Sequence, residues 1–225
     1  NVVVPAEECY TTSLGQPSFT ALHITTTDTV SLYASNFKAN TFDVTNVLPT
    51  PTLSDSYMLQ TYAPGSGNGE FAILAVEDET VIDITSTASS ADGQLLKDST
   101  ITITLDSGEV YMQFSSRQDE EFSGTTIFSH DCKPVAVFQG NVCTYIPIDQ
   151  AACDHIYEQA IPTAYWGRRF VVTSSMMRTN DRVRITALHD GCLLYRNGVF
   201  LTTLRAGHTF EYEQDAMNQA VFLET

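Results

Sequence analysis

Apolar and small polar side chains alternate along much of this 225-residue sequence, and this alternation restricts the fold more than any other feature. Successive side chains of a strand point to opposite faces, so a period of two indicates a strand with one buried face. Threonine and the β-branched residues that fill these segments also favour strands. The clearest predicted strands cover residues 29–34, 71–76, 80–85, 100–105 and 183–188.

Turn-forming residues separate these segments. Glycine, proline, asparagine and aspartate accept the backbone angles of tight turns, and they cluster at residues 64–67, 92–93, 106–108, 190–191 and 197–198. The last of these clusters, Asn197-Gly198, predicts a two-residue hairpin between arms at residues 193–196 and 199–202. Long amphipathic helical patterns are absent. The sequence therefore predicts an all-β fold.

Residues 70–84 match residues 182–196 in their pattern of apolar and polar positions, at a spacing of 182 − 70 = 112 residues. A glycine-led strand pattern follows in both places. The correspondence predicts the same pair of strands twice, with Ile73 and Ile185 buried at equivalent positions. A period near 110 residues is too long for solenoid coils and fits repeated β-sandwich-like units.

A further landmark is a strand pattern that ends in asparagine, at Asn36 and again at Asn141. Together these landmarks predict tandem pseudo-repeats of antiparallel β-sandwich-like units. The sequence closes within a strand-like run, so we expect it to be a piece of a longer protein. The predicted divisions are the end of one copy, a complete copy and most of a third, at residues 1–36, 37–141 and 142–225.

The composition is acidic, with 27 Asp and Glu against 11 Lys and Arg, which gives a net charge of −16. Nucleic acids and anionic membranes are bound by clustered lysine and arginine, so neither is an expected partner. No run of about 18 apolar residues is present, so we expect no membrane insertion of this segment. The acidic residues form no EF-hand loop, which leaves solubility in an extracellular setting as the simplest explanation.

Residues 133–172 contain two of the five cysteines and the single tryptophan, Trp166. They run through KPVAVF, a Gly-Asn turn signal, Cys143, a polar loop, CDHIYEQ and the pattern PT-x-x-WG-x-x-F-V. This order resembles the N-terminal domain of the IgG Fc-binding protein family, which includes an animal mucus glycoprotein and surface proteins of gut bacteria. The resemblance implies a secreted or surface-displayed β-rich module that acts by binding. Binding of Fc belongs to particular animal members.

The cysteine pattern indicates an oxidising compartment. The resemblance implies a paired loop between Cys143 and Cys153, and closing so short a loop stabilises a fold by about 2–3 kcal/mol. Cys132 and Cys192 lie in loops of successive copies and form a candidate second bridge, which would leave Cys9 unpaired. No two cysteines form a CxxC pair, so zinc is not indicated.

Asp154, His155 and Glu158 form a D-H-x-x-E pattern within residues 154–160, the one short helical candidate. On a helical turn, His155 and Glu158 would share a face in a geometry that a metal tolerates. The alternative is that Asp154 caps the helix and that the three side chains hydrogen-bond the disulfide loop. We favour this alternative because no further His or Cys cluster accompanies them, and we expect no metal and no cofactor.

Trp166 and Arg168 lie in the densest aromatic and cationic cluster of the chain. Such a cluster is typical either of a binding hot spot or of a core tryptophan whose arginine neighbours project to solvent. We favour the core position for Trp166 because an apolar strand pattern follows it.

Nothing in the sequence indicates catalysis. The five histidines are scattered, and none lies beside a G-x-S-x-G motif. The GSGNG run at residues 65–69 predicts a loop, because no phosphate-binding helix pattern follows it. The paired acids at residues 77–79 and 119–121 lie in turn contexts, where solvated carboxylates are common. We expect a protein that is not an enzyme.

Two functional hypotheses follow. The first is an extracellular or cell-surface adhesion module that recognises a host or mucus glycoprotein, immunoglobulin-like or otherwise, or a glycan. The second is an accessory domain that binds or cuts mucin-type sugars. Binding residues usually lie on loops of such scaffolds, so the candidate ligand contacts are Tyr145, Asp149, Gln150 and Arg168. The insertion at residues 86–99 is a second candidate loop.

Overall fold

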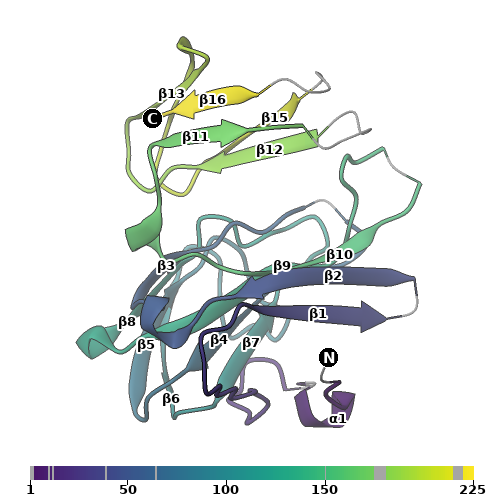
Figure 1. Cartoon of the computed structure of the whole chain (residues 1–225), viewed down its shortest axis with the longest axis vertical. Coiled ribbons are helices and arrows are strands. Elements are labelled where there is room, and N and C mark those ends of the chain that lie inside the picture. Colours follow the sequence, from purple (N-terminus) through teal and green to yellow (C-terminus); the bar gives the residue numbers. More distant parts are fainter. Residues whose placement is uncertain are drawn as a thin grey trace.

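The computed structural model describes residues 3–9, 11, 13–38, 40–63, 65–149, 151–174, 181–214 and 220–225. Antiparallel strands dominate it, which confirms the all-β prediction (Figure 1). The helical elements are α1 (Ala6–Cys9), η1 (Thr50–Thr52), η2 (His130–Cys132) and η3 (Thr163–Tyr165). The strands are β1 (Leu32–Lys38), β2 (Thr41–Val47), β3 (Ser56–Met58), β4 (Gly69–Ala75), β5 (Thr80–Thr85), β6 (Thr100–Leu105), β7 (Val110–Phe114), β8 (Thr126–Ser129), β9 (Val135–Thr144), β10 (Asp154–Gln159), β11 (Arg169–Val172), β12 (Asp181–Thr186), β13 (Cys192–Arg196), β14 (Val199–Leu204), β15 (Thr209–Gln214) and β16 (Val221–Glu224).

Two four-stranded sheets form a central unit, with the strand orders β10-β9-β4-β7 and β3-β8-β5-β6. Alternate residues of β4 and β5 are buried, as a period of two requires. The inward side chains of both sheets form one hydrophobic core, in which the rings of Phe71 and Phe122 meet edge to face with centroids 4.8 Å apart. The central unit is therefore a β-sandwich.

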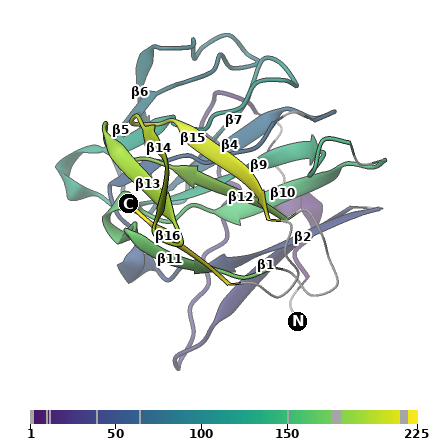
Figure 2. The same cartoon turned by 90° about the horizontal axis from the view of Figure 1, so that it is seen from above.

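A C-terminal unit lies against the central one, over β9 and β10 (Figures 1 and 2). It consists of the two-stranded sheet β12-β15 and the four-stranded sheet β11-β16-β13-β14. Its core is smaller and centres on Ala187, Leu194 and Leu204. The Asn197-Gly198 turn joins β13 to β14, as predicted.

The pairing pattern of the central unit occurs again in the C-terminal unit. The order β3-β8-β5-β6 is matched by β11-β16-β13-β14, and the pair β4-β7 by β12-β15. The starts of β4 and β12 are 181 − 69 = 112 residues apart, and those of β5 and β13 are 192 − 80 = 112 apart. Ile73 is fully buried, whereas Ile185 is half-buried against the smaller core.

The division at residues 1–36, 37–141 and 142–225 stays a prediction. Its two inner boundaries fall inside β1 and β9, so each strand would end one copy and continue into the next. Both strands form hairpins with the strand that follows them, β2 and β10. The hairpins are then equivalent positions of successive copies.

The prediction of a helix over residues 154–160 is wrong, because this segment is strand β10. The segment pairs with β9, and the adjacent disulfide holds its start beside the end of that strand. The predicted turn at Gly140-Asn141 is also wrong, since both residues lie within β9 and pair with β4. Gly140 is required there because a Cβ atom would collide with the carbonyl oxygen of Ile156 on β10.

The core position predicted for Trp166 is wrong as well. Its side chain is half-buried at the end of η3, outside both hydrophobic clusters, and its indole Nε1 donates to the carbonyl oxygen of Ile161 at 3.1 Å. The apolar strand that follows, β11, leaves Phe170 and Val171 exposed. An apolar neighbour in sequence therefore did not indicate burial here.

The β1–β2 hairpin covers the outer edge of β10 with side chains. The backbone N–H groups of Tyr157 and Gln159 donate to Asp43 Oδ2 and Thr45 Oγ1 at 2.8 and 2.9 Å. Exposed strand edges invite pairing with other chains, so these contacts protect the edge of the central sheet. In the described part of the chain, no helix is long and apolar enough to cross a membrane.

Candidate binding site at the Cys143–Cys153 loop

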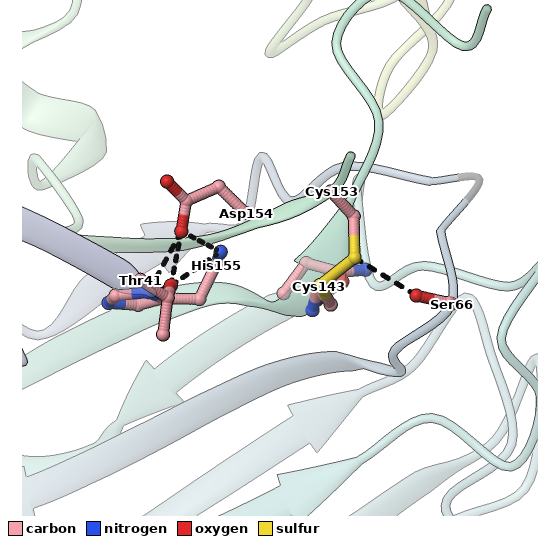
Figure 3. Close-up of a disulfide and its surroundings, with 7 residues drawn as sticks. Thr41, Ser66, Cys143, Cys153, Asp154 and His155 are labelled. Atoms are coloured by element: carbon pink, nitrogen blue, oxygen red, sulfur yellow. Dashed lines mark hydrogen bonds and ion pairs between the residues drawn. A yellow bond between two sulfur atoms is a disulfide. The ribbon is translucent and has the colours of Figure 1, made fainter. Parts of the chain in front are cut away.

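Cys143 and Cys153 form a disulfide, as the sequence predicted, with their Cα atoms 5.3 Å apart. The bond joins the end of β9 to the start of β10 and closes the loop of residues 144–152 (Figure 3). Cys9, Cys132 and Cys192 are free thiols. This confirms the unpaired Cys9 and corrects the suggested Cys132–Cys192 bridge. Cys132 lies in η2 of the central unit, whereas Cys192 begins β13 in the C-terminal unit.

The GSGNG run, residues 65–69, lies beside the disulfide loop. Residues 65–68 lie outside the helices and strands, as the predicted loop requires, whereas Gly69 begins β4. The Gly67 N–H donates to the carbonyl oxygen of Cys143 at 2.9 Å, and Gly65 forms a β-bridge with Thr144. Ser66 Oγ lies 3.0 Å from Cys153 Sγ (Figure 3). A Cβ atom on Gly67 would collide with the backbone of Cys143, so glycine permits this close approach.

The disulfide loop presents apolar and acidic groups to solvent. Ile146 and Ile148 are 42% and 63% exposed, Asp149 is exposed and Tyr145 is half-buried. Gln150 lies outside the described residues. Sequence reasoning selected the polar residues and missed the two isoleucines, although an apolar residue in a polar loop was the available signal.

Arg168 is exposed but does not join this site. It immediately precedes β11, beyond the end of β10 that lies away from the disulfide (Figure 1). The candidate contacts thus divide into a loop group and a separate arginine.

Asp154 and His155 follow the disulfide and contact β2 instead of capping a helix (Figure 3). Asp154 Oδ1 accepts hydrogen bonds from Thr41 Oγ1 and from the His155 N–H, and Thr41 Oγ1 also contacts His155 Nδ1. The hydrogen bond from Thr41 is the main reason that the pKa of Asp154 is lowered, and the His155 N–H adds to it. These contacts fix the start of β10 to the β1–β2 hairpin.

Glu158 does not share a face with His155, because residues three apart on a strand point to opposite sides. Part of the Glu158 residue is exposed to solvent, but desolvation by the surrounding protein, followed by the charge of Asp43, raises the pKa of this carboxyl. Among the described residues, no group of three or more His, Cys, Asp or Glu side chains could hold a metal ion.

A further cluster of polar side chains lies at the junction between the two units. Arg184 of β12 donates to Glu121 at 2.7 Å and lies 3.3 Å from Glu211, and its guanidinium stands over the ring of Tyr62. Burial is the first cause that raises the pKa of Tyr62 to about 12, and the charge of Glu211 is the second. Together with Arg184, the residues Gln60, Gly140 and Glu158 line a cavity of about 150 Å³.

The paired acids also have structural contacts. Glu121 binds Arg184, Asp119 binds Arg117 at 2.7 Å, and Asp78 accepts the Ser107 N–H at 3.0 Å. The expectation of solvated faces therefore describes Asp119, which is exposed, better than Glu121, which lies at the junction.

Residues 43–224 match the model of the family described as IgGFc binding protein. The chain belongs to this IgGFc-binding family. It is similar to the human protein named IgGFc-binding protein, with 28% identity over 191 residues that cover 82% of this chain. The chain spans only about 3% of that relative's length. No solved structure matches it.

Membership of the IgGFc-binding family confirms the resemblance drawn from residues 133–172. The family match begins within β2 and ends within β16, so it includes both units and the disulfide loop. The family is described as one of binding proteins. Within the described residues, the disulfide loop combines a covalent constraint with exposed apolar side chains.

Proposed function

We propose that this chain is an extracellular, non-enzymatic module that binds a protein partner through the disulfide loop of residues 144–152. The proposal rests on the exposure of Ile146 and Ile148. Their loop is closed by a disulfide and is hydrogen-bonded to the GSGNG segment. The Fc region of immunoglobulin G is the first partner to test, because the human relative is named for binding it.

The loop has the physical properties of a preorganised contact. Association costs conformational entropy when a loop is ordered on binding, and a cross-link reduces that cost. The backbone bond between Gly67 and Cys143 and the bridge between Gly65 and Thr144 add further constraint. Exposed isoleucines then gain favourable burial of apolar surface when a partner covers them.

The charge of the chain favours a partner with a neutral or basic surface. With a net charge of −16, the module repels acidic macromolecules at long range. On the loop, Asp149 places a carboxylate beside the apolar pair, so a lysine or arginine of the partner would complement it.

The Cys143–Cys153 disulfide supports an oxidising, extracellular location for the chain. Disulfides persist in secreted and surface proteins and are rare where thiols are kept reduced. The location on a bacterial surface or in mucus is part of this proposal and is consistent with the resemblance to the family.

The test is a binding measurement with point variants of the loop. We expect immobilised Fc to bind the chain saturably, and Ile148→Ser to weaken binding about tenfold, or about 1.4 kcal/mol. The matched control is Val199→Ser, since Val199 is 65% exposed on β14, close to the 63% of Ile148. Equal effects of the two variants, or none from Ile148→Ser, would place the site elsewhere.

A glycan array and a turnover assay on mucin O-glycans separate this proposal from the glycan hypothesis. Binding to protein without turnover supports it. Hydrolysis that a single change such as Glu121→Gln abolishes would overturn the non-enzymatic assignment, and saturable glycan binding without protein binding would overturn the choice of partner.

A further inference from the structure

A cavity of about 240 Å³ lies between β2 and β10 and is called here the β2–β10 cavity. The two strands lie side by side (Figure 1), and backbone N–H groups of β10 donate to side chains of β2. Contacts through side chains leave more space between two strands than a ladder of backbone hydrogen bonds does. Residues 43–46 and 156–158 line the cavity. Because Val44, Asn46 and Glu158 are exposed, the cavity opens to solvent.

The lining of this cavity combines negative charge with apolar walls. Its two charged side chains, Asp43 and Glu158, are both carboxylates, and no lysine, arginine or histidine is among the described residues that line it. The amide oxygen of Asn46 is a further hydrogen-bond acceptor. Val44 and Ile156 supply apolar surface. A lining of this composition suits a cation that also carries apolar surface.

Glu158 differs from the glutamates at the junction between the units. Glu121 and Glu211 both form ion pairs with Arg184. Among the described residues, the carboxylate of Glu158 has neither an ion-pair partner nor a hydrogen-bond donor. Desolvation, followed by the charge of Asp43, raises the pKa of this carboxyl, so its surroundings oppose its negative charge. A cation bound beside Glu158 would offset both effects.

We propose that the β2–β10 cavity binds a guanidinium group, which an arginine side chain of the protein partner supplies. A guanidinium is planar, presents several N–H donors to carboxylates and is more weakly hydrated than an ammonium, so it suits a cavity with both acceptors and apolar walls. An apolar cavity of about 150 Å³ holds a benzene molecule. The larger β2–β10 cavity therefore has room for a guanidinium and part of its methylene stem.

This inference rests on the proposed function, because the arginine belongs to the partner that the disulfide loop contacts. Glu158 lies 158 − 153 = 5 residues after Cys153, which closes the loop, on the same strand. A strand rises about 3.3 Å per residue, so the two positions are about 16 Å apart along β10. One partner surface of about 800 Å² covers such a distance. The net charge of −16 also favours a partner with exposed arginines.

A small arginine derivative tests the cavity by itself. The probe is Nα-acetyl-L-arginine methylamide, and the matched control is the citrulline compound, which has the same shape and no charge. We expect the arginine probe to shift the backbone amide resonances of residues 43–46 and 156–158 saturably, in the millimolar range because one side chain makes few contacts. The citrulline probe should not. Equal shifts from both probes, or none, would overturn the proposal, and equal binding of the lysine compound would overturn the choice of guanidinium.

Two variants separate the charge of the cavity from its space. Glu158→Gln keeps the shape of the side chain and removes its charge, so the arginine probe should bind about fivefold more weakly. Val44→Trp keeps both carboxylates and fills part of the cavity, so it should weaken binding as well. The control is Glu77→Gln, since Glu77 is exposed between β4 and β5 and does not line the cavity. Unchanged affinity in Glu158→Gln would contradict the proposal.

Measurements with Fc identify the source of the guanidinium and separate this inference from the proposed function. We expect Glu158→Gln to weaken Fc binding about fivefold and an excess of the arginine probe to compete with Fc. If Ile148→Ser weakens Fc binding and Glu158→Gln does not, the loop remains the site and this inference fails. If the arginine probe binds the cavity but Fc does not bind the chain, the proposed function fails, and the partner is overturned as the source of the guanidinium.

Discussion

The central and C-terminal units share a pattern of strand pairing and differ in how much they bury. Of the described residues, 16 buried apolar side chains form the central core, and three form the C-terminal one. At equivalent positions, Ile73 has no exposed surface and Ile185 is half-buried. Two units with the same hydrogen-bonded topology are therefore expected to differ in stability, because burial of apolar surface is the dominant favourable contribution to folding.

The outer faces of the two units differ in the same direction. Strand β6 of the central unit exposes the threonines at positions 100, 102 and 104, whereas the equivalent β14 exposes Val199 and Leu201. The central unit thus separates apolar and polar residues more completely. We therefore expect the central unit to be the stable platform of the molecule and the C-terminal unit to depend on contacts with it.

The largest expected effect comes from the paired core positions. Ile73→Ala should lower the free energy of unfolding by about 2–5 kcal/mol, because it leaves a cavity in a close-packed core. Ile185→Ala should cost less than half as much, since the half-buried site loses less contact. Chemical denaturation measures both. Equal costs would contradict the difference in burial between the units.

Replacing Arg184 should weaken the contact between the two units, so that the C-terminal unit unfolds before the central one. This guanidinium binds Glu121 and Glu211 from opposite units and contacts the ring of Tyr62. Breaking a partly buried ion pair leaves an unpaired charge and costs about 3 kcal/mol. In Arg184→Met we expect hydrogen exchange to rise first in β12 and β15. The control is Arg117→Met, whose exposed pair with Asp119 should contribute less than about 1 kcal/mol. A uniform rise across both units would show that they do not unfold separately.

Loss of the disulfide should affect the loop and leave the platform folded. Closing a ten-residue separation stabilises by about 2–3 kcal/mol in the chain-entropy description, which is a minority of the 5–15 kcal/mol typical of a domain. In the double variant Cys143→Ser, Cys153→Ser, we expect faster hydrogen exchange in residues 144–149 and an unchanged exchange rate in β4. Cooperative collapse on mild reduction would contradict this.

The smallest expected effect is a pH dependence at Glu70, whose equivalent is Arg182. Burial raises the pKa of Glu70 to about 7, whereas Arg182 is ion-paired with Glu213 at 2.9 Å. The folded state therefore keeps a proton that the unfolded chain releases near pH 4.5. Stability from this group is fully present below pH 4.5 and is lost as the pH rises to 7.

Glu70→Gln should remove this dependence. After allowance for the partial exposure of Glu70, the variant should be more stable than the wild type by about 2 kcal/mol at pH 8 and equal to it at pH 4. Arg182→Gln should leave the difference between pH 4 and pH 8 nearly unchanged. Parallel stability profiles of the wild type and Glu70→Gln would contradict the raised pKa.

The sequence predicted the strands whose pattern is local. The bounds of β5 and β6 agree with the predicted residues 80–85 and 100–105, because each strand alternates clearly and is followed or preceded by turn residues. The recurrence at 112 residues likewise predicted β12 and β13 from β4 and β5. Periodicity carries this information without knowledge of the neighbours.

The predictions were wrong where contacts between residues distant in sequence determine the local structure. Residues 154–159 form a strand because β9 pairs with one side and Thr41, Asp43 and Thr45 bind the other. Burial of Trp166 and pairing of Cys132 depend on which segment packs against them, and no local pattern reports that. At the candidate site, the disulfide could be predicted from the sequence. The backbone contacts of the loop with Gly65 and Gly67 could not, because they depend on how the chain folds.

We propose that the closed loop of residues 144–152 carries binding and that the central unit only supports it. The most direct test replaces residues 144–152 with a glycine-serine linker of equal length between Cys143 and Cys153, and measures the affinity for Fc beside the wild type. We expect the replaced chain to keep its far-ultraviolet spectrum and a melting temperature within a few degrees of the wild type, and to bind Fc at least tenfold more weakly. A folded replacement that binds with wild-type affinity would contradict it and reduce the loop to a structural link.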